Sequence, residues 1–443
     1  MHQVNLMKIL HLNTSDVSDG ASRAVYRLHR GLVALGVDSN MLVQNKSISD
    51  YRVIGPRSNS AKVLTKLRSI LDKAPLFCYR NRSETIFSPA WVPNLLPAKI
   101  RRHNPDIVHL HWIGGGFIPI EMLRKINTPI VWTLHDMWAF TGGCHYDEWC
   151  GRYITECHSC PALGSSKRLD LAYLIWKRKL KFWQGLPLTL VTPSRWLADC
   201  VSVSKVLGHY PVEVIHNGLD LSLYKPTDKT QARGILGLPK NKKLVLFGAM
   251  TATNDNRKGF RFLQTALQKI AKLEDRTRYA ILVFGASEPK KPPDLGFETY
   301  YLGHLHDDIS LALLYSAADV FVLPSKQDNL PNTILEALAC GTPSVAFNIG
   351  GTPDMIKHKI NGYVAKPLDT DDLAAGIRWV LAGKERHAEL SKEAREKAVA
   401  SFALEKIGKK YISLYQSTLT RWNNRRVIEH QKRPMAPVNL ISS

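Results

Sequence analysis

Two carboxylates, those of Asp328 and Glu336, flank the start of a helix that the sequence predicts after a buried strand. The apolar run 319–324 is typical of a strand in a parallel sheet, and a helical pattern follows, which we expect Asn332 or Thr333 to cap. Phosphorylated ligands bind α/β sheets where such a strand meets an open helix N-terminus. Glu336, one turn inside the helix, can accept hydrogen bonds from a ribose diol. The alternative is that Glu336 is an ordinary solvated carboxylate.

Two adjacent cations, Arg257 and Lys258, precede Gly259 and another predicted helix. Cations at the start of a helix can hold a diphosphate and offset the negative charge that develops on a leaving group. In a chain with 60 Lys and Arg, the alternative is that both are solvated surface charges.

The ends of other predicted strands supply three further candidates. Gly20 closes a polar loop and can bring backbone N–H groups towards a phosphate, whereas His135 and Arg195 each follow a short apolar run. Because the carboxyl ends of parallel strands meet at one edge of a sheet, these residues can face the same cleft. The alternatives are a structural role for His135 and a surface ion pair for Arg195.

Short apolar runs alternate with helical patterns along the chain, which predicts an α/β protein with parallel sheets. The runs are 8–12, 37–43, 106–111, 129–135 and 188–194 in the first half, and 244–248, 281–284, 320–323 and 344–347 in the second. A chain of 443 residues suits two such domains, and we expect them to face one cleft.

The segment that begins at Asp328 reads Asp-x7-Glu and then Ala-Leu-Ala-Cys-Gly-Thr-Pro. It resembles the Glu-x7-Glu signature of the retaining family 4 glycosyltransferases, and the resemblance extends, with gaps, over most of the chain. Two departures are the aspartate itself, which stands where the family has glutamate, and Pro331, where the family usually has glycine.

The resemblance implies the GT-B fold, in which two Rossmann-like, doubly wound domains face a central cleft. Residues 1–220 would form the acceptor-side domain, with basic segments that can face a membrane, and residues 221–403 the domain that binds a nucleotide sugar. Residues 404–443 would supply a helix that crosses back to the first domain, followed by a basic tail whose tip we expect to be disordered.

The resemblance also implies roles for single residues. Lys258 matches the lysine that contacts the nucleotide diphosphate. The family's arginine usually follows the preceding strand, but this chain has Gly248-Ala249-Met250 there, so we expect Arg257 to replace it. The implied catalytic residues are His135, Lys258, Arg257 and Asp328, and the implied donor-binding residues are Gly20, Arg195, Asn329, Leu330 and Glu336.

Four cysteines, Cys144, Cys150, Cys157 and Cys160, cluster in one segment, where only the last pair has a common zinc-ligand spacing. We predict a structural zinc that holds this segment over the cleft, and the alternative is reduced thiols without a ligand. The cleft-forming loops have no Asp-x-Asp motif, and we expect catalysis to require no metal or other cofactor.

The net charge of +22 implies an anionic partner. Basic residues concentrate in 57–102, and this segment and 171–183 both show apolar residues at helical spacing. We therefore expect peripheral contact with an anionic membrane surface. The alternative is that each segment is an ordinary helix with one buried face.

We predict a metal-independent, retaining hexosyltransferase that transfers a sugar from a nucleotide-diphosphate sugar to a glycan or lipid-linked acceptor, in the biosynthesis of a cell-surface or exported polysaccharide. The alternatives are a non-catalytic relative that binds anionic lipid or nucleic acid, and a sugar-nucleotide epimerase. No nucleic-acid-binding motif is present, so we expect no nucleic-acid partner. The first residues do not resemble a signal peptide and the seven cysteines are an odd number, so we expect a cytoplasmic protein, peripheral to the inner face of the membrane.

Overall fold

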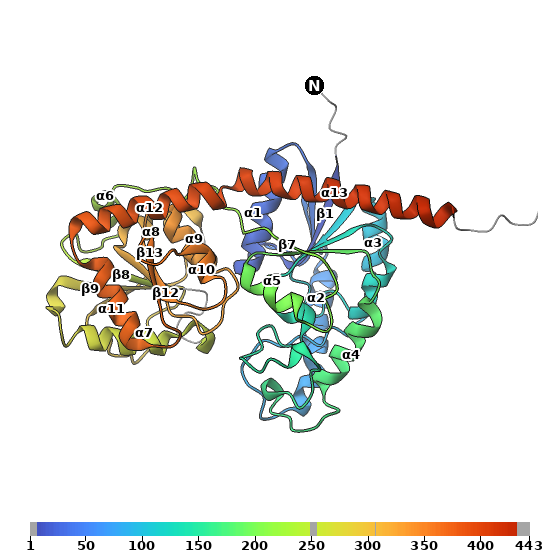
Figure 1. Cartoon of the computed structure of the whole chain (residues 1–443), viewed down its shortest axis with the longest axis horizontal. Coiled ribbons are helices and arrows are strands. Elements are labelled where there is room, and N and C mark those ends of the chain that lie inside the picture. Colours follow the sequence, from blue (N-terminus) through green and yellow to red (C-terminus); the bar gives the residue numbers. More distant parts are fainter. Residues whose placement is uncertain (1–6, 249–254, 306, 432–443) are drawn as a thin grey trace, which may run out of the picture.

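The computed structural model describes residues 7–248, 255–305 and 307–431, and within these ranges it contains two parallel sheets (Figure 1). Each sheet has helices on both faces, so the prediction of two Rossmann-like domains is confirmed. The described residues include no helix that is long and apolar enough to cross a membrane.

The first domain contains a seven-stranded sheet in the order β3-β2-β1-β4-β5-β6-β7. Its strands are β1 (Lys8–Ser15), β2 (Asp38–Asn45), β3 (Val53–Ile54), β4 (Ile107–Leu110), β5 (Ile130–Thr133), β6 (Leu188–Thr192) and β7 (Val212–Val214). Its helices are α1 (Gly20–Ala34), α2 (Asn59–Lys73), α3 (Leu96–His103), α4 (Leu171–Trp183) and α5 (Arg195–Ser202). The central strands are buried along their whole length, as their mostly apolar sequences predict.

The second domain contains a six-stranded sheet in the order β10-β9-β8-β11-β12-β13. Its strands are β8 (Lys243–Gly248), β9 (Tyr279–Phe284), β10 (Glu298–Tyr301), β11 (Val320–Leu323), β12 (Ser344–Phe347) and β13 (Gly362–Ala365). Its helices are α6 (Lys229–Ile235), α7 (Phe260–Ile270), α8 (Asp308–Ala317), α9 (Asn332–Ala339), α10 (Thr352–Met355), α11 (Thr370–Leu381) and α12 (Lys384–Phe402). Two separate apolar clusters cover the two faces of this sheet.

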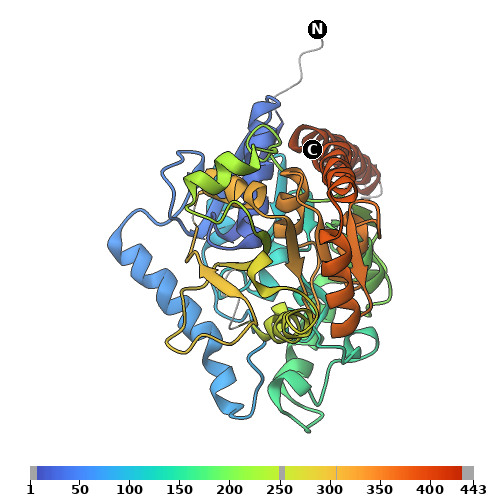
Figure 2. The same ribbon diagram turned by 90° about the vertical axis from the view of Figure 1, so that its left-hand side faces the viewer.

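The chain passes between the domains twice, and the two crossings lie side by side. The backbone N–H of Leu219 donates to Phe402, and the N–H of Leu404 donates back to Leu219. The last helix, α13 (Leu404–Gln431), then runs along the first domain, where Ile407 and Tyr411 pack in one cluster with residues of α1 and the sheet (Figure 1). Figure 2 shows the same helix along its axis, beside the first sheet.

Candidate active site

The carboxylate of Asp328 lies where the predicted strand meets the predicted helix. It belongs to the loop between β11 and α9, and it is buried. Lys258 Nζ lies 2.6 Å from its Oδ2 atom, and Arg257 Nη1 lies 3.3 Å from the same oxygen. Burial tends to raise the pKa of Asp328, but the two cations outweigh it, so the pKa is lowered and the carboxylate is ionised.

The two cations come from a short 3₁₀ turn, Asn256–Lys258, which precedes α7. The turn ends at Gly259 with φ +74°, and a Cβ there would overlap the carbonyl of Pro324, so glycine is required for the approach of the two loops. The N–H of Lys326 donates to the carbonyl of Arg257 at 2.8 Å, which fixes the loops together. Ala249 and Met250, in the position of the family's usual arginine, lie outside the described residues.

Arg257 also joins the second domain to the first. Its guanidinium lies over the ring of Tyr146, 4.6 Å from the ring centroid, and its Nη1 donates to the carbonyl of Gln327 at 3.0 Å. Asp328 and Asp255 act together with Tyr146 to keep the pKa of Arg257 above its usual range despite burial. Sequence reasoning missed Tyr146, because an isolated tyrosine among the cysteines carries no local signal.

Asn329 forms a second contact between the domains. Its side-chain amide donates to the carbonyl of His135 at 3.0 Å, and its Oδ1 atom accepts a hydrogen bond from Ser194 at 2.6 Å. The loop after β11 therefore lies directly against the carboxyl ends of β5 and β6. The structure thus brings Asp328, Asn329 and His135 to one interdomain site.

His135 lines a small pocket at the end of β5. Burial lowers its pKa to about 4, although Asp136 and Asp19 act in the opposite direction, so the ring is neutral at pH 7. Other residues that line the pocket are His111, Trp112, Trp132, Asp136, Trp138 and His145. All of the residues that line this pocket belong to the first domain.

Glu336 is buried where the two domains meet and does not lie on a solvated helix face. Its Oε1 atom lies 2.8 Å from Nη1 of Arg27, and its Oε2 atom accepts a hydrogen bond from the hydroxyl of Tyr315 at 2.9 Å. Arg27 also contacts Asp308 at 3.2 Å and the hydroxyl of Tyr224 at 2.9 Å. Because each carboxylate oxygen can accept more than one hydrogen bond, these contacts leave acceptor capacity on Glu336.

The start of α9 differs from the prediction, because neither Asn332 nor Thr333 caps it. Pro331 occupies the cap position, and no side chain accepts a hydrogen bond there. Asn332 instead donates to the carbonyl of Gly20 at 2.7 Å and accepts a hydrogen bond from Asn217 at 2.9 Å. The expectation of a capping asparagine was therefore wrong, and its side chain serves an interdomain contact that includes Gly20.

Two other expected donor-binding residues point elsewhere. The side chain of Arg195 is 76% exposed and pairs with Asp354 at 3.5 Å, so a role at the donor would require it to turn. Leu330 is buried in the apolar cluster of the second domain, which leaves only its backbone for ligand contacts.

The four cysteines lie in one part of the first domain, and Cys144, Cys157 and Cys160 are buried. Burial raises the pKa of Cys157 to about 12 and that of Cys160 to about 11, so the thiols are protonated in this arrangement. Among the described residues, the one set of three metal-binding side chains within 4.8 Å of one another is His11, His109 and His111. A zinc bound to the cysteines therefore remains a prediction and would require the thiols to move closer.

Two family models match this chain. Residues 18–223 match the family model described as Glycosyltransferase Family 4, and residues 241–383 match that described as Glycosyl transferases group 1. The chain is 22% identical over 440 residues to a putative colanic acid biosynthesis glycosyl transferase, WcaC, of Escherichia coli, covering 93% of this chain and 100% of that protein.

Solved structures show the same architecture. Sucrose-phosphate synthase from Thermosynechococcus elongatus aligns with a TM-score of 0.69 at 21% identity, over 94% of this chain and 100% of that one. Anabaena HepE in complex with UDP-glucose aligns with a TM-score of 0.59 at 18% identity, over 93% and 100% of the two chains. The two family models together cover most of the chain, and the chain therefore belongs to the family 4 glycosyltransferases and has their GT-B fold.

Proposed function

We propose that this glycosyltransferase transfers a hexosyl group from a nucleotide-diphosphate sugar to a glycan or lipid-linked acceptor, with retention at the anomeric carbon and without a catalytic metal. The observation that carries the proposal is the buried Asp328 with two cations, Lys258 and Arg257, at the strand end that faces His135. This arrangement places one carboxylate and two cations together where the two domains meet.

In the proposed reaction the bond between the anomeric carbon and the diphosphate oxygen breaks, and a bond to an acceptor hydroxyl oxygen forms. The proton of that hydroxyl passes to the leaving diphosphate. The leaving diphosphate gains negative charge as its bond breaks, and Lys258 and Arg257 offset that charge, which is the task that a metal ion performs in other transferases. Asp328 and His135 position the donor sugar, and Glu336 accepts hydrogen bonds from the ribose. Gly20, Asn329 and the backbone of Leu330 complete the donor site.

A uridine diphosphate sugar is the first donor to test, because the solved relative HepE binds UDP-glucose. A product class is suggested by WcaC, whose name places it in colanic acid biosynthesis. We therefore propose that the acceptor belongs to the biosynthesis of a surface or exported polysaccharide.

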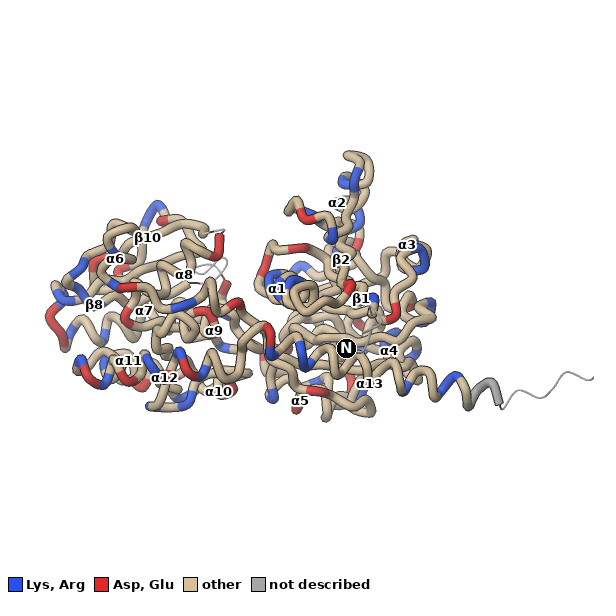
Figure 3. Tube along the Cα trace, turned by 90° about the horizontal axis from the view of Figure 1, so that it is seen from above, with Lys and Arg blue, Asp and Glu red and all other residues tan. Residues whose placement is uncertain are grey.

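We also propose that the first domain binds an anionic membrane surface through α2. Five apolar side chains of this helix are each about half exposed, so the helix has no ordinary buried apolar face: Val63, Leu64, Leu67, Ile70 and Leu71. Figure 3 shows α2 standing away from the rest of the domain, with cations along it. Apolar side chains flanked by Lys and Arg suit the interface of an anionic bilayer.

The second amphipathic segment behaves differently, because α4 packs into the first domain. Its Ile175, Trp176 and Trp183 are buried in the core, and only Leu174 among its larger aliphatic side chains is strongly exposed. The alternative of an ordinary helix with one buried face therefore describes α4, and the membrane proposal is confined to α2 and its surroundings.

The function is tested by measuring thermal unfolding with UDP-, GDP-, ADP- and dTDP-sugars, followed by a transfer assay with each sugar nucleotide that stabilises the protein. A ligand at 100 times its Kd should raise the free energy of unfolding by about 2.7 kcal/mol. Binding of a sugar nucleotide without release of nucleoside diphosphate in the presence of any acceptor would favour a non-catalytic relative. No stabilisation by any nucleotide would contradict the proposal.

A further inference from the structure

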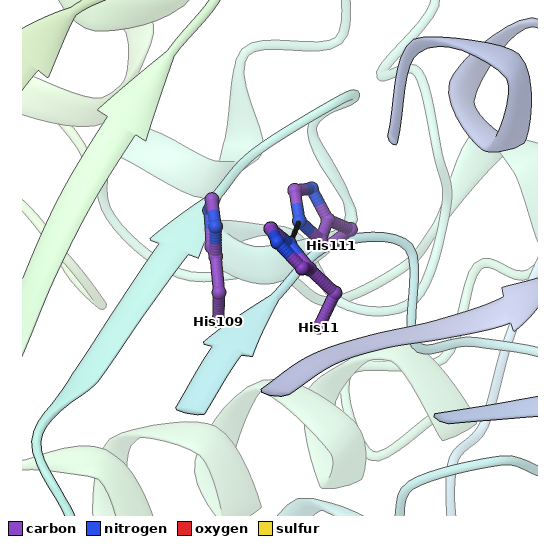
Figure 4. Close-up of side chains that lie close together, drawn as sticks. All are labelled: His11, His109 and His111. Atoms are coloured by element: carbon purple, nitrogen blue, oxygen red, sulfur yellow. Dashed lines mark hydrogen bonds between the residues drawn. The ribbon is translucent and has the colours of Figure 1, made fainter. Parts of the chain in front are cut away.

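Three histidines, His11, His109 and His111, form a buried row behind the proposed site (Figure 4). His11 and His109 pair in register between β1 and β4, and His111 lies two residues further along the same face. His135 follows the next strand, β5, and lines the small pocket of the first domain. Its backbone carbonyl accepts a hydrogen bond from Asn329 of the second domain. The row therefore connects the interior of the first domain with the interdomain site.

Three of these rings form a continuous hydrogen-bonded chain. Nδ1 of His11 lies 2.9 Å from Nε2 of His111, and Figure 4 shows the two rings turned toward each other. Nδ1 of His111 lies 3.2 Å from Nε2 of His135. His109 is outside this chain, because its nitrogens contact the hydroxyls of Tyr415 at 2.7 Å and Thr133 at 2.8 Å.

All three rings of the chain are neutral at pH 7. Burial lowers the pKa of His11 and of His111 well below the usual value, and it lowers that of His135 to about 4. A neutral imidazole carries one N–H and one lone pair, so His111 must donate on one side and accept on the other. The hydrogen bonds among the three rings can therefore run in one of two directions. The position of the proton on one ring determines its position on the other two.

The inner end of the chain decides its direction. Nε2 of His11 is buried and has no hydrogen-bond partner among the described residues. If His135 donated to His111 and His111 donated to His11, this atom would carry a buried proton without an acceptor. Proteins avoid a buried unpaired N–H group more strictly than an unused lone pair. In the other direction His11 donates to His111, His111 donates to His135, and only a lone pair of His11 is left unused.

We propose that His111 and His11 are positioning residues that fix the tautomer of His135, so that its Nε2 accepts from His111 and its Nδ1 carries the proton. The benefit of this proton rests on the proposed function, since an N–H group can donate to a hydroxyl oxygen of the donor sugar.

A metal ion is the competing use of the same histidines. Three imidazoles within 4.8 Å of one another can bind Zn²⁺, but only Nε2 of His11 lacks a partner. Ligation by His109 would displace the hydroxyl of Tyr415 or Thr133, and ligation by His111 would break the chain to His11 or His135. The existing hydrogen bonds therefore favour the chain.

The tautomers can be read directly from nitrogen chemical shifts of ¹⁵N-histidine-labelled protein at pH 7, without substrate. The His135→Gln variant assigns the His135 signals by their disappearance. We expect a protonated Nδ1 and an unprotonated Nε2 on His135. A proton on Nε2 would overturn the proposal, and so would about one equivalent of zinc that His11→Asn removes.

Two substitutions of similar size separate positioning from packing. His111→Leu removes the donor to His135 and should give a mixture of tautomers and lower kcat about tenfold, with the Kd of nucleoside diphosphate unchanged. His111→Asn retains an amide near the position of Nδ1 and should restore most of the lost rate and the Nδ1–H tautomer. A control, His387→Asn, replaces a half-buried histidine of α12 in the second domain that contacts the carbonyl of Asp319 and should alter neither tautomer nor kcat.

If His111→Leu and His111→Asn lose stability and activity equally while the tautomer of His135 stays unchanged, the role is structural and the proposal is wrong. If no sugar nucleotide is turned over, the proposed function fails, but the tautomer measurement still decides the direction of the chain. The two failures are therefore distinguishable.

Discussion

Oε1 of Glu336 lies 2.8 Å from Nη1 of Arg27, although α9 and α1 belong to different domains. Arg27 is 9% exposed and Glu336 is 5% exposed in their side chains, so the pair is removed from water. The residue proposed to bind the ribose thus also holds the two domains together. Nucleotide binding and the relative position of the domains are expected to depend on the same carboxylate.

Glu336→Gln should raise the Kd of the nucleoside diphosphate about tenfold and lower the free energy of unfolding by about 3 kcal/mol, because it breaks a buried ion pair. Titration calorimetry and urea unfolding measure the two effects. Glu389→Gln changes an exposed residue of α12 and is the matched control. It should change neither the Kd of the nucleoside diphosphate nor the free energy of unfolding. An unchanged Kd for every nucleotide that binds the wild type would remove Glu336 from the site.

Asn329→Asp should weaken the contact between the domains, because the amide that donates to the carbonyl of His135 becomes a carboxylate that faces it. A buried polar group left unpaired costs about 2 kcal/mol, so we expect kcat to fall at least tenfold. Small-angle scattering should show a larger radius of gyration without ligand. Asn241→Asp, on the surface, serves as the control. Wild-type kcat and dimensions would show that this contact is dispensable.

Local patterns could predict the strands that build the site. The strands β11 and β12 were expected at 320–323 and 344–347, and they occupy those residues because continuous apolar runs mark buried parallel strands. Lys258 and Asp328 lie close together because their loops follow neighbouring strands of one sheet. Such neighbours are brought together by topology alone.

No local sequence pattern indicates the contacts between the domains. Arg27 sits on a helix whose spacing indicates only one apolar face, and nothing local connects it with Glu336. The last helix runs to Gln431. The rest of the predicted tail, residues 432–443, lies outside the described residues. Contacts that depend on how two domains meet cannot be inferred from periodicity in either one.

Leu64→Ser should weaken binding to vesicles that contain phosphatidylglycerol about tenfold, because burial of a leucine side chain in the bilayer interface contributes about 1.5 kcal/mol or more. Transfer to a soluble acceptor should be unchanged. Ile235→Ser removes a side chain of similar exposure from α6 in the second domain and is the control. Vesicle sedimentation that shows equal losses for both variants, or none for Leu64→Ser, would contradict a role for α2.

The cysteine cluster is tested by elemental analysis of protein purified without added zinc. If Cys144, Cys150, Cys157 and Cys160 bind a structural zinc, we expect about one equivalent, which Cys157→Ser should abolish. Cys78→Ser, which changes an exposed thiol outside the cluster, should retain the metal. Less than about a tenth of an equivalent in the wild type would establish the reduced thiols instead.

The central claim is that Lys258 stabilises the diphosphate leaving group. Lys258→Ala leaves Asp328 its contact with Arg257 at 3.3 Å, so the fold should persist. Affinity for the free nucleoside should barely change, since the base and ribose are not held by this lysine. Lys272→Ala, an exposed cation just beyond α7, provides the matched loss of charge.

The most direct measurement is the rate of nucleoside diphosphate release from the donor sugar nucleotide in the presence of acceptor, compared between the wild type, Lys258→Ala and Lys272→Ala. We predict that Lys258→Ala lowers kcat by about one to three orders of magnitude, while Lys272→Ala retains the wild-type rate. A wild-type rate for Lys258→Ala would contradict the proposed site.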